Sequence, residues 1–437
     1  MDRRTFVRRT ATAAGAVAVG GAIAVPGSLD AQQRATAAGG QALPESIQRM
    51  RPMSPAVQPI SDEERLARIE KARRLMKDNN IGAIFLEPGS SMFYYTGVRW
   101  GLSERPFGVV IPADGELAYI TPGFEEERAR ELIKFSKDVR VWQEDESPYR
   151  LIAQILRDRG VVTGRVGFEE RVRFFIADGV RSEAPQLEFV SATPVTAGCR
   201  MFKSKAELAL MQRANDITIA GYRAAFPTLH VGMTQSEMSR TIAAAITKLG
   251  GEGGGALVLF GVSSAFPHGT TKPATLKDGD IVLVDGGCSV EGYASDITRT
   301  TVFGKPSERQ RSIWDLEKRA QSTAFAAAQI GATCESVDAA ARKVITDAGF
   351  GPDYKVPGLP HRTGHGIGLD GHEWTNFVRG NTTPIQPGMC FSDEPTVVIY
   401  GEFGVRLEDC LYIGEDGPHF FSEQSPAIDR PFPKLSS

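Results

Sequence analysis

The segment DGDIVLVDGGCSVEGYASDITRTTVFG (278–304) constrains the fold most strongly, because it sets two acids within an apolar β-hairpin. Two β-rich runs flank a four-residue loop (289–292), and Asp285 and Asp296 are equidistant from its centre. Equidistant residues of an antiparallel hairpin lie opposite each other on one face. We therefore predict two opposed carboxylates, whose repulsion a cation or a proton must neutralise. The alternative, in which either acid is a turn or cap residue, fits poorly with their mid-strand positions.

A second pair of acids occurs in a similar apolar setting near the C-terminus. PGMCFSDEPTVVIY (387–400) and GVRLEDCLYI (404–413) are predicted strands separated by the turn-like GEFG. They contain Glu394 and Glu408, each beside an aspartate that would face the other way in a regular strand. The alternative is that both glutamates lie on the exposed faces of edge strands. Two acids in matching settings favour a shared site instead.

Three of the six histidines lie in HRTGHGIGLDGHEW (361–374), namely His361, His365 and His372. They could form a metal cage or have separate roles. Four carboxylates with one imidazole make an oxygen-rich ligand set that suits Mn²⁺, Fe²⁺, Co²⁺ or Zn²⁺. Four carboxylates also carry enough charge to hold two such ions, which can activate a shared water and polarise a carbonyl group. The sequence thus predicts hydrolysis of an amide or a similar C–N bond.

Other hydrolytic arrangements are absent from the sequence. It contains no HExxH zinc motif and no GxSxG nucleophile elbow. The five cysteines include no CxxC pair, and we expect buried free thiols without activating neighbours. The net charge of -3, with mixed signs, gives no electrostatic basis for binding nucleic acid or a membrane.

Helical and strand-like segments alternate through residue 195, which is typical of an α/β domain. The expected helices are 61–80, 175–185, 204–226, 236–250, 306–329 and 335–348, and the expected strands include 81–86, a hairpin in 105–122, and 166–170. Ser61 and Ser236 are the expected N-caps of two of these helices. GGEGGG (250–255) has no GK[ST] after it, so we expect a flexible loop rather than a phosphate cradle.

The N-terminus has the composition of a targeting segment. MDRRTFVRRT contains paired arginines, and an Ala/Gly/Val run occupies 11–25. A basic stretch before a weakly apolar one resembles a twin-arginine export signal, with a disordered basic tail as the alternative. We expect cleavage after Ala31, a linker or arm over 32–60, and export of the mature chain to the periplasm. No strongly apolar run of about 18 residues follows, so the mature chain should not span a membrane.

Together these segments resemble the pita-bread metal hydrolases, which include methionine aminopeptidase, prolidase, Xaa-Pro aminopeptidase and the metal-free creatinase. The matching order begins with His268 in FPHG and continues through the aspartate hairpin, HRTGHGIGLDGHE, SDEPTVV and GVRLED. DNNIGAIFLEPGSSMFYYTGVRW (78–100) resembles the N-terminal domain of the prolidase and creatinase branch. The resemblance implies an α+β fold, with a smaller creatinase-type α/β domain (61–196) before a pita-bread catalytic domain (197–437).

The resemblance also implies roles for individual residues. Five of them would be metal ligands: Asp285, Asp296, His365, Glu394 and Glu408. Asp296 and Glu408 would bridge both ions and Asp285 would serve one. Glu394 would also hold the nucleophilic water and act as general base.

Four further residues would act on the substrate side of the metal site. His268 and His372 would bind substrate and stabilise the tetrahedral intermediate. In the proline-specific branch, His361 and an arginine in the position of Arg406 line the substrate pocket. All of these positions are intact in this chain.

The leading hypothesis is an exported dinuclear metallopeptidase that cleaves the bond before a proline, of the Xaa-Pro aminopeptidase or prolidase type. A related hydrolase of another C–N bond, in a non-peptide or carboxypeptidase-type substrate, is the alternative within enzymes. A non-catalytic pita-bread binding protein would be expected to have lost metal ligands, and none is lost here. We expect a peptide substrate, two divalent ions (manganese first, then cobalt, iron or zinc), and a homodimer or higher homo-oligomer.

Overall fold

The computed structural model describes residues 43–434. The predicted export signal (1–31) and the start of the predicted linker (32–42) lie outside the described residues. The rest of the linker is not wholly irregular, because it contains the short helix α3 (Glu45–Gln48). None of the helices between residues 43 and 434 combines the length and the apolar character that crossing a membrane requires.

The first half of the described chain builds a six-stranded mixed sheet in the order β4-β3-β2-β1-β5-β6. Its strands are β1 (Ile81–Leu86), β2 (Gly108–Pro112), β3 (Ala118–Pro122), β4 (Val139–Trp142), β5 (Gly164–Phe168) and β6 (Leu187–Ser191). The helices are α4 (Asp62–Asp78), α5 (Ser90–Thr96), α6 (Glu126–Leu132), α7 (Pro148–Asp158), α8 (Phe174–Glu183) and α9 (Thr193–Arg200). The predicted α/β alternation and the antiparallel β2–β3 hairpin are both confirmed.

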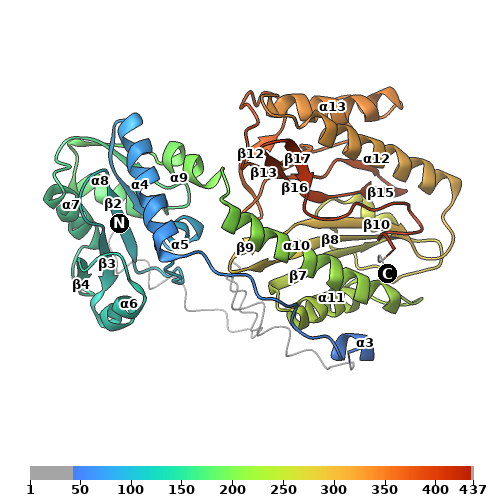
Figure 1. Ribbon diagram of the computed structural model, residues 1–437, viewed down its shortest axis with the longest axis horizontal. Coiled ribbons are helices and arrows are strands. Elements are labelled where there is room, and N and C mark those ends of the chain that lie inside the picture. Colours follow the sequence, from blue (N-terminus) through green and yellow to red (C-terminus); the bar gives the residue numbers. More distant parts are fainter. Residues whose placement is uncertain (1–42, 435–437) are drawn as a thin grey trace, which may run out of the picture. The chain divides into compact units, whose positions relative to one another are not determined.

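The second half contains three sheets. The strands are β7 (Glu252–Phe260), β8 (Ile281–Val290), β9 (Tyr293–Ala294), β10 (Ile297–Val302), β11 (Gly364–Gly366), β12 (Glu373–Phe377), β13 (Cys390–Asp393), β14 (Thr396–Ile399), β15 (Phe403–Arg406), β16 (Asp409–Gly414) and β17 (Gly417–Phe420). One sheet has the order β10-β8-β7, one has β12-β11-β13-β16-β17, and β14 pairs with β15. The helices are α10 (Lys205–Ala225), α11 (Gln235–Leu249), α12 (Glu308–Ala327) and α13 (Cys334–Asp347). Figure 1 shows these strands between the pair α10 and α11 and the pair α12 and α13.

Side-chain caps set where the helices begin. Ser61 starts α4 as predicted, since its hydroxyl accepts a 3.2 Å hydrogen bond from the amide of Glu64. The prediction for α11 is wrong by two residues, because Thr234 and not Ser236 is the cap. Thr234 accepts from the amide of Glu237, whose carboxylate accepts in return from the amide of Thr234 at 2.7 Å. This capping box needs a Thr and a Glu three residues apart, which Ser236 cannot provide.

The glycine-rich segment 250–255 also differs from its prediction as a flexible loop. Strand β7 begins within it, at Glu252, and pairs with β8. A Cβ at Gly254 would overlap the side chain of Ile246 in α11. The glycines therefore let the strand pass directly over the helix, which explains why a strand lacks side chains here.

The aspartate hairpin folds with a register two residues away from the predicted one. Its turn is the two-residue Glu291–Gly292, both with positive φ (51° and 85°), and not a four-residue loop. Asp285 consequently faces Thr298, and the expectation that it directly opposes Asp296 is wrong. Asp296 still lies on the same face, since it precedes Thr298 by two residues.

The second acid pair lies where two paired strands are interrupted. Asp393 pairs with Asp409 on one side of the break, and Thr396 pairs with Arg406 on the other. One register therefore runs through the break and sets Glu394 across from Glu408. Pro395 has no amide hydrogen, so it cannot continue the ladder after Glu394.

Strand β10 joins the two acid-bearing regions. The amide of Thr298 donates to the carbonyl of Glu408 at 3.3 Å, and the amide of Glu408 donates back to the carbonyl of Thr298 at 3.2 Å. Next to this bridge, the fully buried Arg299 pairs with Asp409 at 2.6 Å and donates to the carbonyl of Glu408 at 2.9 Å. The acids of the hairpin are thereby held against Glu408.

Replacing Arg299 by Met should lower the free energy of unfolding by about 3–5 kcal/mol, because Asp409 would remain buried without its cation. Urea denaturation of the purified variant measures this loss. Arg309→Met is the matched control, since Arg309 forms an exposed pair with Glu402 that is worth about 0–1 kcal/mol. Equal losses in the two variants would contradict a structural role for the buried pair.

Candidate active site

One cavity of about 540 Å³ collects all nine residues that the sequence singled out. It is lined by His268, Asp285, Asp296, His361, His365, His372, Glu394, Arg406 and Glu408, together with Tyr354, Arg362 and Val378. The aspartates come from the β8–β10 hairpin, the two glutamates from the interrupted strands, and His365 from β11. The structure therefore brings the predicted residues together, while their individual roles stay predictions.

The ligand atoms at the centre of the cavity form overlapping groups. Oxygens of Asp285, Asp296 and Glu408 lie within 4.8 Å of one another. A second group of the same size joins Glu408 to Glu394 and His365. Glu408 belongs to both groups, which is the arrangement that two neighbouring cations would require.

The ring of His365 is oriented by a backbone carbonyl. Its Nδ1 lies 3.0 Å from the carbonyl oxygen of Gly366 and donates a hydrogen bond to it, so Nε2 is the nitrogen that faces the acids. That Nε2 lies 3.1 Å from Glu394 and 3.9 Å from Asp296. Burial alone would lower the pKa of His365, but these two carboxylates outweigh it and raise the pKa.

The acids differ in how well the protein stabilises their charge. Burial and the neighbouring carboxylates raise the pKa values of Asp296 and Glu408. Burial alone would also raise the pKa of Glu394, but the hydrogen bond and the charge of His365 outweigh it and lower that pKa. One buried oxygen of Glu408, Oε1, has no hydrogen-bond partner among residues 43–434. The acid cluster thus has more negative charge than its neighbours neutralise.

Two residues connect the acids, and one of them was missed in the sequence. The hydroxyl of Thr298 lies 2.9 Å from Asp285 and 2.7 Å from Glu408. Arg406 donates to Thr298 at 3.0 Å and forms an ion pair with Asp285. Arg406 therefore lines the cavity as predicted, but its guanidinium is engaged by the acid cluster. Thr298 could have been found from the strand period, since it lies two residues after Asp296.

His361 and His268 lie on other walls of the cavity. The Nδ1 of His361 lies 2.7 Å from the carbonyl oxygen of Arg362, so Nδ1 carries the proton and Nε2 is an acceptor. This Nε2 is buried and has no hydrogen-bond partner within the described part of the chain. Burial lowers the pKa of His361, which keeps the ring neutral. His268 also lines a neighbouring groove beside α11.

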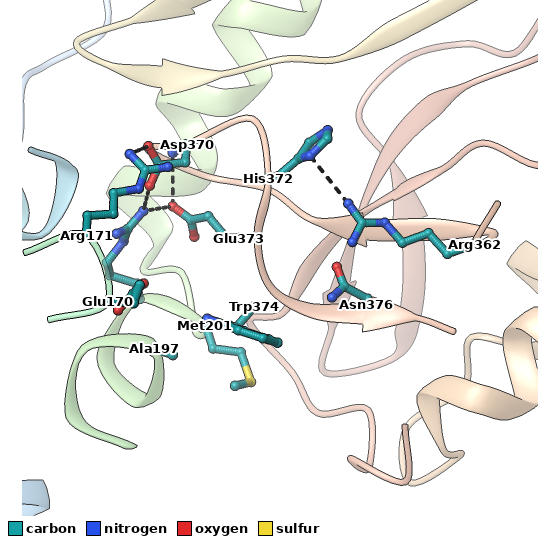
Figure 2. A pocket seen from close by; sticks show the side chains of 11 residues that line it. Glu170, Arg171, Ala197, Met201, Arg362, Asp370, His372, Glu373, Trp374 and Asn376 are labelled. Atoms are coloured by element: carbon teal, nitrogen blue, oxygen red, sulfur yellow. Dashed lines mark hydrogen bonds and ion pairs between the residues drawn. The ribbon is translucent and has the colours of Figure 1, made fainter. Parts of the chain in front are cut away.

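His372 lines both the catalytic cavity and a side cavity of about 310 Å³, whose lining residues Figure 2 shows. The centre of its ring lies 4.0 Å from that of His365, and its Nδ1 lies 3.3 Å from a guanidinium nitrogen of Arg362. Burial and the charge of His365 lower the pKa of His372 to about 4. Arg362 and His372 line both cavities. Arg362 escaped the sequence analysis because an arginine beside a histidine carries no distinctive spacing.

An ion-pair cluster fixes the loop that carries His372. Arg200, at the end of α9, pairs with Asp370 at 2.6 Å and also with Glu373. Lys203 adds a 3.1 Å pair to Glu373. Burial alone would raise the pKa of Glu373, but Lys203 and Arg200 lower it to about 2. Cations of the α9 segment therefore hold the chain on both sides of His372.

The cysteines offer no competing nucleophile. All five are buried free thiols, as expected: Cys199, Cys288, Cys334, Cys390 and Cys410. Burial raises the pKa of each thiol, to about 12 for Cys334 and Cys390. They are thus protonated at neutral pH and poor nucleophiles.

Similar proteins share both halves of this architecture. Residues 209–415 match metallopeptidase family M24, and residues 68–202 match the creatinase/prolidase N-terminal domain. An uncharacterised peptidase of Schizosaccharomyces pombe is 35% identical over 80% of this chain and 80% of its own length. The Xaa-Pro dipeptidase of Lactobacillus helveticus is 30% identical over 80% of this chain and 95% of its own.

A solved structure gives the same result. The prolidase from Thermococcus sibiricus superposes with a TM-score of 0.77 at 28% identity, covering 85% of this chain and 99% of that one. The cavity therefore has the ligand-atom groups of a metal-dependent hydrolase within a fold shared with prolidases. The chain belongs to metallopeptidase family M24 and carries the creatinase/prolidase N-terminal domain before its catalytic region.

Proposed function

We propose that this metallopeptidase hydrolyses the peptide bond that precedes a proline. The observation that carries the proposal is the cavity that unites four carboxylates and His365 with three further histidines, His268, His361 and His372. The names of its relatives, an Xaa-Pro dipeptidase and a prolidase, support the same substrate class. This function is favoured over hydrolysis of another C–N bond because these relatives carry names that refer to peptides with proline.

The residues present fit a pair of divalent ions. The acid cluster supports this fit in two ways. Glu408 keeps a buried oxygen without a hydrogen-bond partner among the described residues, and it belongs to two groups of ligand atoms. We propose Asp285, Asp296, His365, Glu394 and Glu408 as the ligands, with Asp296 and Glu408 serving both ions. Manganese is our first choice, because carboxylate oxygens dominate the set.

Bound divalent ions lower the pKa of a shared water and polarise the substrate carbonyl. The chain's own groups would supply the rest of the chemistry. Glu394 stays ionised beside His365 and accepts a 3.1 Å hydrogen bond from Ser392, so it can take a proton from the attacking water. The neutral His361 offers Nε2 to the substrate, and His268 and His372 would contact the developing oxyanion from the other walls.

Two further features belong to the same proposal. We propose that residues 1–31 direct export through the twin-arginine route, so that the enzyme acts in the periplasm. We also propose that it forms a homodimer or a higher homo-oligomer. Fractionation of cells producing the full chain, with and without Arg3 and Arg4 replaced by Lys, tests the first of these, and light scattering of the purified protein tests the second.

Asp296→Asn should abolish hydrolysis and lower the metal content, because an amide provides only one neutral oxygen where a bridging carboxylate provides two charged ones. Assays on Ala-Pro, combined with elemental analysis of the purified protein, measure both effects. Asp416→Asn is a suitable control, since Asp416 lies in an exposed turn and pairs with His419. Turnover of the Asp296 variant near the wild-type rate would disprove the bridging role.

His361→Ala should lower kcat/KM by about 10²–10³-fold while leaving metal stoichiometry intact, as expected for a residue that contacts substrate and not the ions. The comparison of kinetic and metal data separates this role from ligation. A variant that loses metal together with activity would place His361 in the ligand set instead.

The metal-free protein should become less stable as the pH rises. Burial and Asp285 raise the pKa of Asp296 to about 7, above its value of about 3.9 in an unfolded chain. The folded state therefore binds the extra proton, and the stability that it confers is lost as the pH rises through about 7. The raised pKa of His365 acts in the same direction.

Thermal unfolding of chelator-treated protein at about pH 5.5 and about pH 8.5 tests this expectation. The melting temperature should fall at the higher pH, and added Mn²⁺ should restore it. Asp296→Asn should reduce the pH dependence. A melting temperature that rises with pH would show that the acid cluster is not protonated in the metal-free protein.

A further inference from the structure

Three elements of the N-terminal domain converge on Asp370, which lies two residues before His372. Its Oδ1 accepts hydrogen bonds from the hydroxyl of Ser90 at 2.6 Å and from Arg171 at 2.9 Å. Its Oδ2 accepts a hydrogen bond from Arg200 at 2.6 Å. Ser90 begins α5, Arg171 follows β5, and Arg200 ends α9, all within the residues that match the creatinase/prolidase N-terminal domain. One carboxylate of the metallopeptidase region therefore joins separate parts of that domain.

The loop that carries His372 is held at its two ends. Gly371 is exposed, and a Cβ there would meet no atom of the described residues within 4 Å. At one end, Glu373 begins β12 and is held by sheet pairing as well as by its ion pairs. At the other end, Asp370 precedes the strand, and its side-chain bonds take the place of sheet pairing. Loss of the Asp370 carboxylate should therefore release one end of the loop.

The position of His372 in the catalytic cavity depends on this loop. The centre of its ring lies 4.0 Å from that of His365, and Asp370 lines the side cavity but is not among the residues that line the catalytic one. Figure 2 shows Asp370 and Arg171 on one side of the loop and the ring of His372 directed the other way, toward Arg362. A displacement of about 1 Å in a reacting geometry can reduce a rate about 100-fold. A carboxylate outside the catalytic cavity can thus control a side chain within it.

We propose that Asp370 is a positioning residue, which holds His372 in place and so makes the N-terminal domain a part of the catalytic apparatus. This inference rests on the proposed function, in which His372 contacts the developing oxyanion, and adds the residue that sets the place of that histidine. A carboxylate that only fastens the two domains together would affect stability and leave the reaction unchanged. The experiment separates these two roles.

The test measures hydrolysis of Ala-Pro by the full chain loaded with Mn²⁺. Asp370→Asn sets a neutral amide against the guanidinium groups of Arg171 and Arg200. The value of kcat should fall about 10- to 100-fold while KM changes by less than about threefold, because His372 acts on the transition state. The content of bound metal should stay the same. Asp370→Glu retains a carboxylate and should recover part of the lost kcat.

A double variant shows whether Asp370 acts through His372. His372→Ala removes the side chain that Asp370 is proposed to position. Adding Asp370→Asn to His372→Ala should lower kcat by less than about twofold further, since the effects of coupled residues do not add.

Ser90→Ala is a milder probe of the same carboxylate. Ser90 is not among the residues that line either cavity, and its hydroxyl donates one hydrogen bond to Asp370. Loss of that bond should lower kcat about 2- to 10-fold. This variant provides the test if Asp370→Asn does not fold.

Asp138→Asn is the matched control. Asp138 is also held by two arginines, Arg140 and Arg159, and its side chain is 21% exposed, against 15% for Asp370. It directly precedes β4 of the N-terminal sheet and is not among the residues that line the two cavities. Its replacement should lower the melting temperature and leave kcat unchanged.

Each other outcome has a definite meaning. A lowered melting temperature with full kcat in Asp370→Asn would show that the carboxylate only joins the domains, and would overturn the assignment. A loss of kcat that adds to that of His372→Ala, a loss of bound metal, or a rise in KM alone would overturn it as well. All of these results leave the proposed function in place. Wild-type protein that cleaves neither Ala-Pro nor Ala-Pro-Ala would refute the proposed function, and the assignment with it.

Discussion

The two backbone hydrogen bonds between Thr298 and Glu408 hold the active site together. They join the aspartate hairpin to the strand break that carries Glu408, although 110 residues separate the two in sequence. The hydroxyl of Thr298 then contacts both Asp285 and Glu408, so one residue contributes to the bridge through its backbone and to the cluster through its side chain. Arg299, whose side chain lies on the opposite face of β10 from that of Thr298, stabilises the same junction by pairing with Asp409.

Charge is the second constraint on this centre. Four carboxylates lie close together, and within the described chain Arg406 forms an ion pair with Asp285, while His365 contacts Glu394 and Asp296. Buried like charges are costly, and the protein therefore raises the proton affinity of Asp296 and Glu408. The same repulsion that weakens the metal-free site is what divalent ions would relieve, so affinity for metal and pH dependence have a common origin.

The segment that follows the first sheet, around the end of α9, also contributes to the site. Arg200 and Lys203 hold the chain on either side of His372, which in turn lies between His365 and Arg362. A cation cluster outside the catalytic cavity thus positions a histidine inside it. The acid cluster, the imidazole of His372 and the guanidinium of Arg362 therefore follow one another along the wall of the cavity.

The sequence by itself determined the acids, the histidines and most helices and strands, because apolar periodicity, caps such as Ser61 and acids in apolar strands are local signals. It also determined the family, because its spaced motifs occur along the chain in the order that is typical of the pita-bread metal hydrolases. Only the tertiary structure decided the hairpin register, the opposition of Glu394 and Glu408, and the engagement of Arg406 by Asp285. That Arg362 has no carboxylate partner in the described chain is likewise visible only in three dimensions. Pairing across strands and the presence or absence of a neutralising charge depend on residues distant in the chain, and no local pattern records them.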